Sequence, residues 1–431
     1  MKNRSLFVSC TLISLNSKPC IFTEYITKSQ SLVSLFVLKK NIATFVSTKR
    51  NLIKPIYMRF VVSSTALLSH LQSISKVINS KNTLPILDCF LLELNGSTLT
   101  LTAADTETRL VTSLEVNEVE GSGKLAINAR NLLDPLKELP DQPLTFEIND
   151  DNLEIFIYFH NGKYNFIGQS GEEYPQPKEL KDTAISLSID PQILCTAINR
   201  TLFASADDEL RPVMNGIYFD ITTEDLTFVA SDGHKLVRSK TLSAKGSERA
   251  SFILPKKPAN LLKSILPKES EVVTIKFDEN NAYITMSSYT MTCRFIEGRY
   301  PNYNSVIPQN NPNKVVLDRL AFLNALKRVS VFSNPASSLV KLQLSDNKLL
   351  VSAQDIDFST AAEETIPCQY EGTAMNIGFK SNFLIEILNN IPATEVSVEL
   401  SDPSRAGLIF PVEKGDGEDL LMLLMPMMLN D

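Results

Sequence analysis

The sequence predicts an α+β protein built from three tandem copies of one domain, each with two helices packed on antiparallel sheets. Three observations lead to this prediction. Sequence landmarks recur about every 125 residues, amphipathic helix patterns occur twice in each copy, and alternating strand patterns fill the intervals. With 431 residues and 43% hydrophobic content, the chain is long enough for several domains with their own cores.

The clearest landmark is a strand that ends in an aspartate. It reads LTLTAAD at 99–105, LTFVASD at 226–232 and LLVSAQD at 349–355. The closing aspartates lie 127 and 123 residues apart. An alternating apolar run that ends in a turn residue predicts a β-strand followed by a tight turn.

A second landmark is a helix pattern closed by proline, and a third is a helix start opened by Ser or Asp. The proline-closed patterns occupy 131–140, 260–267 and 382–392, and the helix starts lie at Ser64, Asp190 and Asp318. Pro191 suits the first turn of its helix. Three landmarks in one order and at nearly one spacing indicate a whole domain present three times, rather than a short-period solenoid.

Each copy is expected to run from a strand into a helix, through two or three strands, into a second helix and then further strands. The spacing of Leu67, Leu71 and Ile74 is typical of the apolar face of a helix. Turns rich in Asp and Asn break the later strands at 149–152 and 278–281. The predicted domains are residues 58–183, 184–309 and 310–431.

Residues 1–57 differ from the rest of the chain and are left outside the predicted fold. They carry nine Lys and Arg and one acid, Glu24, whereas the whole chain has 42 bases and 49 acids. Three interpretations stay open: an imperfect export signal, an organelle transit peptide, or sequence upstream of a true start at Met58. We favour the last, because the regular pattern begins at Met58.

Composition and motifs argue against an enzyme or a metal-binding protein. The chain has only three histidines, and its six cysteines lie far apart without a C-x-x-C pair. Free thiols suit a reducing compartment, which predicts a cytoplasmic protein and argues against the alternative of a secreted repeat protein. No phosphate-binding or nucleophile motif occurs. Asp232 and His234 would be the strongest acid–base candidates, but the other copies have Glu107 and Asp357 in place of the histidine.

The formal net charge is −7, yet the bases are concentrated in the predicted helices. Twelve Lys and Arg and five Asp and Glu occupy the six segments 65–80, 129–139, 190–205, 255–268, 317–334 and 380–391. If these helices line one surface, that surface is positive and can hold a phosphate backbone without reading its sequence. The opposing interpretation is that these bases lie on ordinary solvated helix faces.

Three similar domains in tandem leave complementary edges at the two ends of the chain. A head-to-tail contact between two chains would satisfy both edges and close a ring. A monomeric string of three domains is the alternative at this point.

Five local strings resemble the β subunit of bacterial DNA polymerase III, a family of sliding clamps that act as processivity factors. The strings are TLPIL at 83–87, ASDGHKL at 230–236, GRYPNY at 298–303, MNIGF at 375–379 and MPM at 425–427. The resemblance extends from Met58 to about Leu429. It implies a ring formed by a head-to-tail homodimer of clamp-type domains, which encircles double-stranded DNA without sequence specificity. It also implies a non-catalytic protein that needs neither cofactor nor metal.

The resemblance further implies partners and a site for them. The expected partners are the catalytic subunit of the replicative polymerase, an ATP-dependent clamp loader, and other polymerases and repair proteins that carry short hydrophobic motifs containing glutamine; no membrane is expected. The implied partner-peptide cleft consists of Met214, Ser231, Gly233, His234, Lys235, Leu236, Pro301, Val306, Leu423, Leu424, Met425, Pro426 and Met427. Met and Leu side chains give such a cleft a plastic apolar lining.

Thirteen bases are candidates for DNA binding, because they lie on the predicted helices or on loops close to them. They are Lys76, Lys81, Arg130, Lys137, Arg200, Arg211, Lys256, Lys257, Lys263, Arg319, Lys327, Arg328 and Lys380. The sequence departs from the family pattern at Ser305 and Met428, where basic residues are common in the family. These departures affect the expected affinity for partner peptides, not the expected ring.

Overall fold

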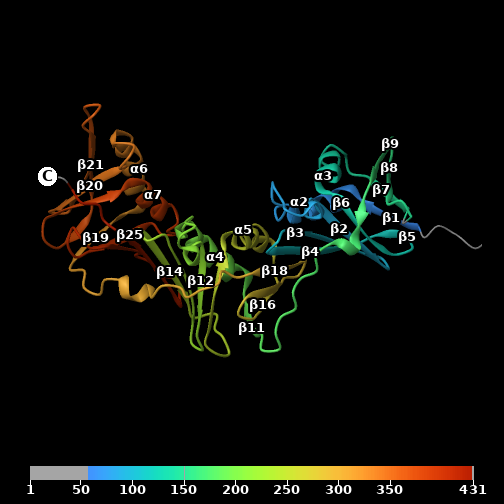
Figure 1. The fold of residues 1–431 in the computed structure, drawn as a ribbon. Helices are drawn as coiled ribbons and strands as arrows, with labels where there is room; N and C mark the ends of the chain where they lie inside the picture. The colour runs from blue at the N-terminus through green and yellow to red at the C-terminus, as the bar shows by residue number, and fades with distance from the viewer. Residues whose placement is uncertain (1–56, 150, 430–431) are drawn as a thin grey trace, which may run out of the picture. The chain divides into compact units, whose positions relative to one another are not determined.

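The computed structural model describes residues 57–149 and 151–429 (Figure 1). These residues belong to one compact unit. The interpretations offered for residues 1–57 fall outside the described residues, apart from Tyr57, which begins the first strand. Within the described part of the chain, no helix is both long and apolar enough to cross a membrane.

The first copy runs from residue 57 to the loop before residue 185. Its helices and strands are β1 (Tyr57–Ser63), α2 (Ser64–Ser75), β2 (Cys89–Asn95), β3 (Thr98–Ala104), β4 (Thr108–Glu115), β5 (Asn117–Glu120), β6 (Gly123–Asn128), α3 (Ala129–Lys137), β7 (Pro143–Asn149), β8 (Glu154–Phe159), β9 (Gly162–Ile167) and β10 (Gln169–Ser170).

The second and third copies repeat this order. The second contains β11 (Ile185–Ile189), α4 (Pro191–Thr201), β12 (Gly216–Ile221), β13 (Leu226–Ser231), β14 (Lys235–Thr241), β15 (Ala250–Pro255), α5 (Lys256–Ile265), β16 (Val273–Phe277), β17 (Asn281–Thr285) and β18 (Tyr289–Arg294). The third contains β19 (Asn313–Asp318), α6 (Arg319–Val329), β20 (Leu339–Ser345), β21 (Lys348–Asp355), β22 (Thr360–Pro367), β23 (Gln369–Glu371), β24 (Met375–Lys380), α7 (Ser381–Asn389), β25 (Glu395–Leu400), β26 (Gly407–Pro411) and β27 (Glu418–Leu424).

The predicted α+β class, with two helices on antiparallel sheets in each of three copies, is confirmed. The helix starts follow the expected chemistry. Asp190 and Asp318 accept hydrogen bonds from backbone N–H groups in the first turns of α4 and α6, and Pro191 is the first residue of α4. In the first copy the cap is Ser63, one residue before the expected Ser64, which already belongs to the helix.

Of the four sheets in the described part of the chain, two cross from one copy to the next. The nine-stranded sheets have the orders β10-β6-β2-β3-β4-β18-β17-β16-β11 and β15-β12-β13-β14-β27-β26-β25-β19-β23. In the first, β4 pairs with β18, and in the second, β14 pairs with β27. The two remaining sheets, β5-β1-β7-β8-β9 and β22-β21-β20-β24, stay within the first and third copies.

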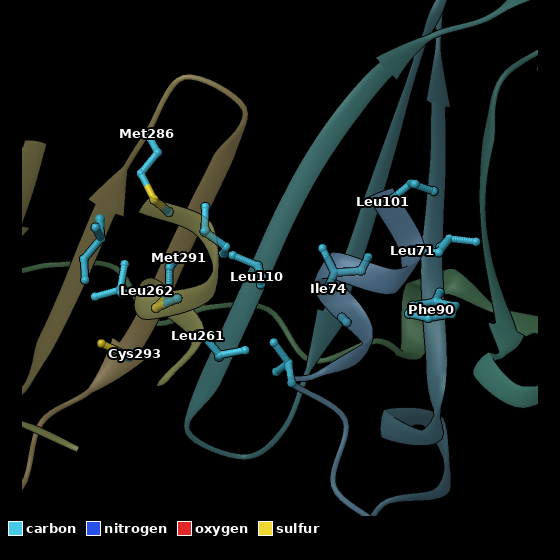
Figure 2. Close-up of a cluster of buried hydrophobic side chains, with 14 of the residues drawn as sticks. Leu71, Ile74, Phe90, Leu101, Leu110, Leu261, Leu262, Met286, Met291 and Cys293 are labelled. Carbon is cyan, nitrogen blue, oxygen red and sulfur yellow. The ribbon is translucent and has the colours of Figure 1, made fainter. Parts of the chain in front are cut away.

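The hydrophobic core continues through the joint between the first two copies (Figure 2). Leu71 and Ile74 on α2 and Leu110 on β4 belong to the same buried cluster as Leu262 on α5 and Met291 on β18. Because all five side chains are almost fully buried, this joint is stabilised by apolar packing as well as by strand pairing. The two copies therefore share one core.

Candidate functional site

The turn between β13 and β14 is held by one aspartate. Asp232 accepts hydrogen bonds through Oδ1 from the N–H groups of His234, at 2.8 Å, and Lys235, at 2.9 Å. Gly233 has a φ of +89°, in the left-handed region that favours glycine. The turn that the sequence predicted after the strand at 226–232 is therefore a rigid hairpin turn. The Asp232 carboxylate is used to build it.

The segment Met425–Met427 lies between this hairpin and the third copy. The N–H of Met425 donates to the carbonyl of His234 at 2.8 Å, and the N–H of Met427 donates to the carbonyl of Gly378 at 2.8 Å. Met425 is 43% exposed, and Pro426 and Met427 are half-buried. The structure thus fixes the backbone of this segment while leaving apolar side-chain surface accessible.

Side chains alternate between the two faces of the sheet along β27. Leu421 and Leu423 belong to an apolar cluster with Leu236, whereas Met422 and Leu424 belong to the core of the third copy. This alternation is the period of a β-strand. Leu236 and Leu423 therefore lie on the face of the sheet under the candidate cleft, and the Leu424 side chain packs on the opposite face.

The loop after β18 covers the face that carries Leu236 and Leu423. Tyr300 and Tyr303 are buried in the same apolar cluster, while Pro301 and Val306 are exposed, Val306 by 56%. The loop thereby presents an apolar rim to solvent.

The short 3-10 turn Pro212–Met214 forms another side of the region. Met214 is almost fully buried, and Arg211, just before the turn, donates to the carbonyl of Asp232 at 3.4 Å. Ser231 is also buried, and its hydroxyl donates to the carbonyl of Lys235 at 2.9 Å. The candidate cleft residues thus come from the hairpin, the loop after β18, the end of β27 and this turn.

Helix α7 contributes two side chains that the sequence analysis missed. The ring of Phe383 lies 5.9 Å from the ring of His234 and 4.3 Å from the Lys235 ammonium, and Glu386 forms an ion pair with Lys235 at 3.1 Å. Lys380, assigned above to DNA, lies 5.0 Å from the same Phe383 ring. The sequence signal was an aromatic residue near the start of a helix, which carries no information about a contact with residues about 150 positions away.

Lys235 is a buried cation at the centre of this region. It is 5% exposed and forms ion pairs with Asp232 at 2.9 Å and with Glu386. Burial by itself would raise the pKa of Asp232, but hydrogen bonds from Lys235 and His234 outweigh it and hold that pKa below its ordinary value. A buried charge is tolerated when it is paired and hydrogen-bonded, so this cluster fixes α7 of the third copy to the hairpin of the second.

Seven of the thirteen candidate DNA-binding bases are engaged within the chain. Six form ion pairs: Lys137 with Asp134, Arg200 with Glu418, Arg211 with Asp208, Lys256 with Asp207, Lys257 with Asp105, and Arg328 with Glu364. The seventh, Arg319, donates to the carbonyls of Ala393, at 2.6 Å, and Leu388, at 3.0 Å. Since Leu388 lies in the last turn of α7, Arg319 satisfies a helix C-terminus.

Five other candidates are exposed and form no ion pair with any described residue. They are Lys76, Lys81, Arg130, Lys263 and Lys327. They come from the C-terminal cap of α2, the loop after it, α3, α5 and α6, so every copy contributes at least one. Within the described residues, no group of three His, Cys, Asp or Glu side chains could hold a metal ion.

Comparisons with known proteins match this architecture along nearly its whole length. Models of the N-terminal, central and C-terminal domains of the DNA polymerase III beta subunit match residues 58–178, 188–302 and 304–428, respectively.

Individual relatives match over the same length. The beta sliding clamps of Pseudomonas putida strain KT2440 and Pseudomonas aeruginosa are 28% and 29% identical over 373 residues, which is 86% of this chain and all of each relative. Crystal structures of the sliding clamps of P. aeruginosa and Bartonella birtlesii, each bound to griselimycin, align with TM-scores of 0.82 and 0.81. These structures are 28% and 26% identical to this chain, and each alignment covers 86% of it and all of the other chain.

Proposed function

This chain belongs to the DNA polymerase III beta subunit family, and from that premise we propose how its own residues close a ring around DNA and receive partners. Members of the family are sliding clamps, non-catalytic subunits that bind DNA, associate with themselves and give a polymerase its processivity. The observation that carries the proposal is the pair of sheets that end in open edges, at β9 in the first copy and β22 in the third.

The repeat itself supports closure of the ring between two chains. Each nine-stranded sheet at an internal joint combines four strands of one copy with five of its neighbour, where β4 pairs with β18 and β14 with β27. The third copy has a four-stranded sheet with β22 at one edge, and the first copy has a five-stranded sheet with β9 at one edge. Since β22 corresponds to β4 and β14, and β9 to β18 and β27, pairing β22 with the β9 strand of a second chain would produce a third sheet of the same kind.

The internal joint predicts the register of this contact. In the first joint, Thr290 lies opposite Val111. Their counterparts are Lys163 on β9 and Glu363 on β22, because the hairpins that contain them match pair by pair. Both side chains are exposed, and within the described residues neither forms an ion pair. Opposite charges directly across two strands favour pairing.

An exposed apolar residue beside β22 supports the same contact. Phe203, thirteen residues after the cap of α4, packs against the core of the third copy across the second joint. Val331 occupies the corresponding position after the cap of α6 and is 77% exposed. In a closed ring, Val331 would pack against the first copy of the other chain.

DNA would be held by topology rather than by tight contacts. The five unpaired bases, Lys76, Lys81, Arg130, Lys263 and Lys327, would meet the phosphate backbone from several sides through individually weak, salt-sensitive contacts. Such contacts permit sliding, while escape requires a joint to open. No cofactor is proposed for this chain, and nucleotide hydrolysis would belong to an ATP-dependent loader.

The surface around Met425 and His234 is proposed as the cleft that binds partner peptides. A glutamine-containing hydrophobic motif from the polymerase catalytic subunit, a clamp loader or a repair protein would insert apolar side chains beside Met425, Val306 and Phe383. The sliding clamps of P. aeruginosa and B. birtlesii bind griselimycin, which supports a ligand-binding surface in such clamps. We propose that this work takes place in the cytoplasm.

The domain limits 58–183, 184–309 and 310–431 are proposed on the spacing of the repeat. The family models for the first two domains match segments inside these limits, and the third model begins earlier, at residue 304.

Retention on DNA of two topologies tests the proposal. The protein would be loaded on circular DNA with a matching loader and ATP, and then followed during gel filtration before and after the circle is cut. Retention on the circle followed by loss from the linear form is the expected result. Equal binding to both forms would contradict the ring.

The cleft is tested separately with a synthetic peptide that carries a glutamine-containing hydrophobic motif. Met425→Glu places a charge on the accessible apolar surface and is expected to weaken binding of the peptide by about tenfold or more, as burial of an unpaired charge demands. Val272→Glu is the control, since Val272 is an exposed apolar residue outside the cleft. Unchanged peptide affinity of Met425→Glu, measured by fluorescence anisotropy, would rule out this location.

A further inference from the structure

The joint between the first two copies carries a cavity of about 260 Å³ on its surface. Leu84, Leu87 and Pro175 contribute apolar surface to it, and Arg109, Lys178 and Arg294 contribute cations. The cavity lies outside the proposed peptide cleft, which is built on the second joint. It is smaller than the sites that enclose drug-sized ligands, which are about 300–1,000 Å³, and suits one or two peptide side chains.

This cavity is built on the same backbone frame as the proposed cleft. Asp105 holds its hairpin turn as Asp232 does, accepting hydrogen bonds from the N–H groups of the second and third residues after it. The N–H of Arg294 donates to the carbonyl of Glu107 at 2.9 Å, as the N–H of Met425 donates to the carbonyl of His234 at 2.8 Å.

The strand registers and the covering loops agree as well. Thr108 pairs with Cys293 at the first joint, as Lys235 pairs with Leu424 at the second. A Tyr-Pro pair follows the last strand of the first copy, β10, and the last strand of the second copy, β18, and Pro175 in the first pair corresponds to Pro301 in the second. The cavity is therefore the counterpart of the proposed cleft, one copy earlier in the chain.

The side chains on this shared frame differ in charge. Arg109 stands where the cleft has Leu236, and Arg294 stands where it has Met425. The Arg294 guanidinium forms an ion pair with Glu297, and Asp105 is neutralised by Lys257. Among the residues that line the cavity, Arg109 and Lys178 are then left with one acid, Glu107. Glu93, whose charge also acts on Arg109, is paired with Lys124, so the cavity keeps a positive balance.

Arg109 is the group that points to a ligand. Its guanidinium donates to the carbonyl of Pro175 at 2.7 Å and lies 5.7 Å from the ring of Tyr174, and within the described residues it has no carboxylate partner. Burial lowers the pKa of Arg109 from its ordinary value, which is the direction expected for a cation that lacks such a partner. A half-buried guanidinium beside apolar surface is suited to a carboxylate.

We propose that this cavity is a second peptide-binding site, which takes a short segment of a partner protein with an apolar side chain followed by a carboxylate. The choice of a peptide rests on the proposed function of the cleft, because the two sites share one frame. The apolar side chain contacts Leu84 and Pro175, which are exposed, and the carboxylate pairs with Arg109. Two peptide sites of different preference on one chain would let an apolar motif and an acidic motif bind at the same time.

The probes are two short peptides that differ only in charge, acetyl-Leu-Phe-Asp-amide and acetyl-Leu-Phe-Asn-amide. Binding to the full chain is followed by NMR chemical-shift changes of isotope-labelled Leu and Met methyl groups. The Asp peptide is expected to bind about tenfold more tightly than the Asn peptide, and to shift the methyl groups of Leu84 and Leu87. Equal affinities for the Asp and Asn peptides would overturn the proposal. So would displacement of the Asp peptide by inorganic phosphate at concentrations similar to those of the peptide.

Two variants locate the site. Arg109→Gln removes the cation, and Leu84→Glu adds an opposing charge at a side chain that is 48% exposed, so the second variant tests the site without disturbing the core. Each variant is expected to bind the Asp peptide about tenfold more weakly, whereas Val272→Glu should bind it with unchanged affinity. Normal affinity of Leu84→Glu for the Asp peptide would contradict the assignment.

The two peptide sites can fail independently. Met425→Glu should leave binding of the Asp peptide intact, and Leu84→Glu should leave binding of the glutamine-containing peptide intact. If Met425→Glu no longer bound the Asp peptide, that peptide would bind in the cleft and the second site would not exist. If Met425→Glu still bound both peptides, the result would contradict the cleft but not the second site.

Discussion

At the scale of single residues, the ammonium of Lys257 in the second copy binds three groups of the first copy. It donates to the carbonyl of Val77, to the carboxylate of Asp105 and, at 2.6 Å, to the side chain of Asn79. The Asp105 side chain is only 6% exposed, so it depends on partners within the protein. Removing Lys257 leaves that carboxylate and the carbonyl of Val77 with fewer donors.

We expect Lys257→Ala to lower the free energy of unfolding by about 1.5–3 kcal/mol, the usual contribution of hydrogen bonds to charged groups. Urea unfolding followed by circular dichroism measures this change. Lys263→Ala on the same helix is the matched control, because Lys263 is exposed and lacks an ion pair among the described residues; its effect should stay within about 0.5 kcal/mol. A similar loss in both variants would show that helix propensity, not the link, is responsible.

Lys257 also shows where sequence patterns stop being informative about single residues. A lysine on an amphipathic helix is equally compatible with a DNA phosphate and with an acceptor in the neighbouring copy. Which of these it meets depends on a contact about 150 residues away in the chain. Arg319 is a similar case, since its guanidinium satisfies the carbonyls at the end of α7. The repeat predicted the helices that carry these residues, but not the partners of their charges.

At the scale of elements, the β13–β14 hairpin joins the second copy to the third. Its strand β14 pairs with β27 along seven residues, and its turn is tied to α7 through Lys235 and Glu386. The acidic turn was predictable from the sequence, because Asp followed by Gly has a strong turn preference. Its connection to α7 was not, because nothing local in the sequence marks Phe383 or Glu386 as neighbours of His234.

The contribution of Asp232 to the stability of the folded state should decrease in acid. Hydrogen bonds hold the pKa of Asp232 below its ordinary value of 3.8, so the carboxylate stabilises the folded state above that pH. This contribution is lost as the pH falls through the lower folded pKa. The thermal midpoint of the natural chain should therefore exceed that of Asp232→Asn by a constant amount from about pH 5 to 7, and the difference should shrink below about pH 4. Calorimetry at several pH values measures it, and a difference that grew in acid would contradict the assignment.

At the scale of the whole molecule, assembly depends on strand pairing at the joints between neighbouring copies. Two joints are formed within the chain by pairing of adjacent strands, and the third is proposed between chains with β22 and β9 in the same roles. The threefold repeat made this arrangement predictable as a class of assembly. The register was not predictable from the sequence alone, because it depends on the observed pairing of β4 with β18 and on turns of different lengths.

Reversing one charge tests that register. Lys163→Glu would place like charges opposite Glu363 at both joints of a dimeric ring, and we expect the dimer dissociation constant to rise about tenfold. Adding Glu363→Lys should restore it, since the pair is then reversed rather than lost. Analytical ultracentrifugation measures the constant. Lys276→Glu, on an exposed position of β16, is the control, and failure of the double variant to recover would show that the two residues are not opposite each other.

The sheets that run through the two internal joints also decide how the chain can be divided. A fragment cut to residues 184–309 would carry β14 and β18 as bare edges, each with a row of unpaired N–H and C=O groups. It would also be cut from the apolar cluster that it shares with α2 and β4. One sequence repeat is therefore not a unit that folds independently. We expect such a fragment to aggregate rather than remain monomeric in solution.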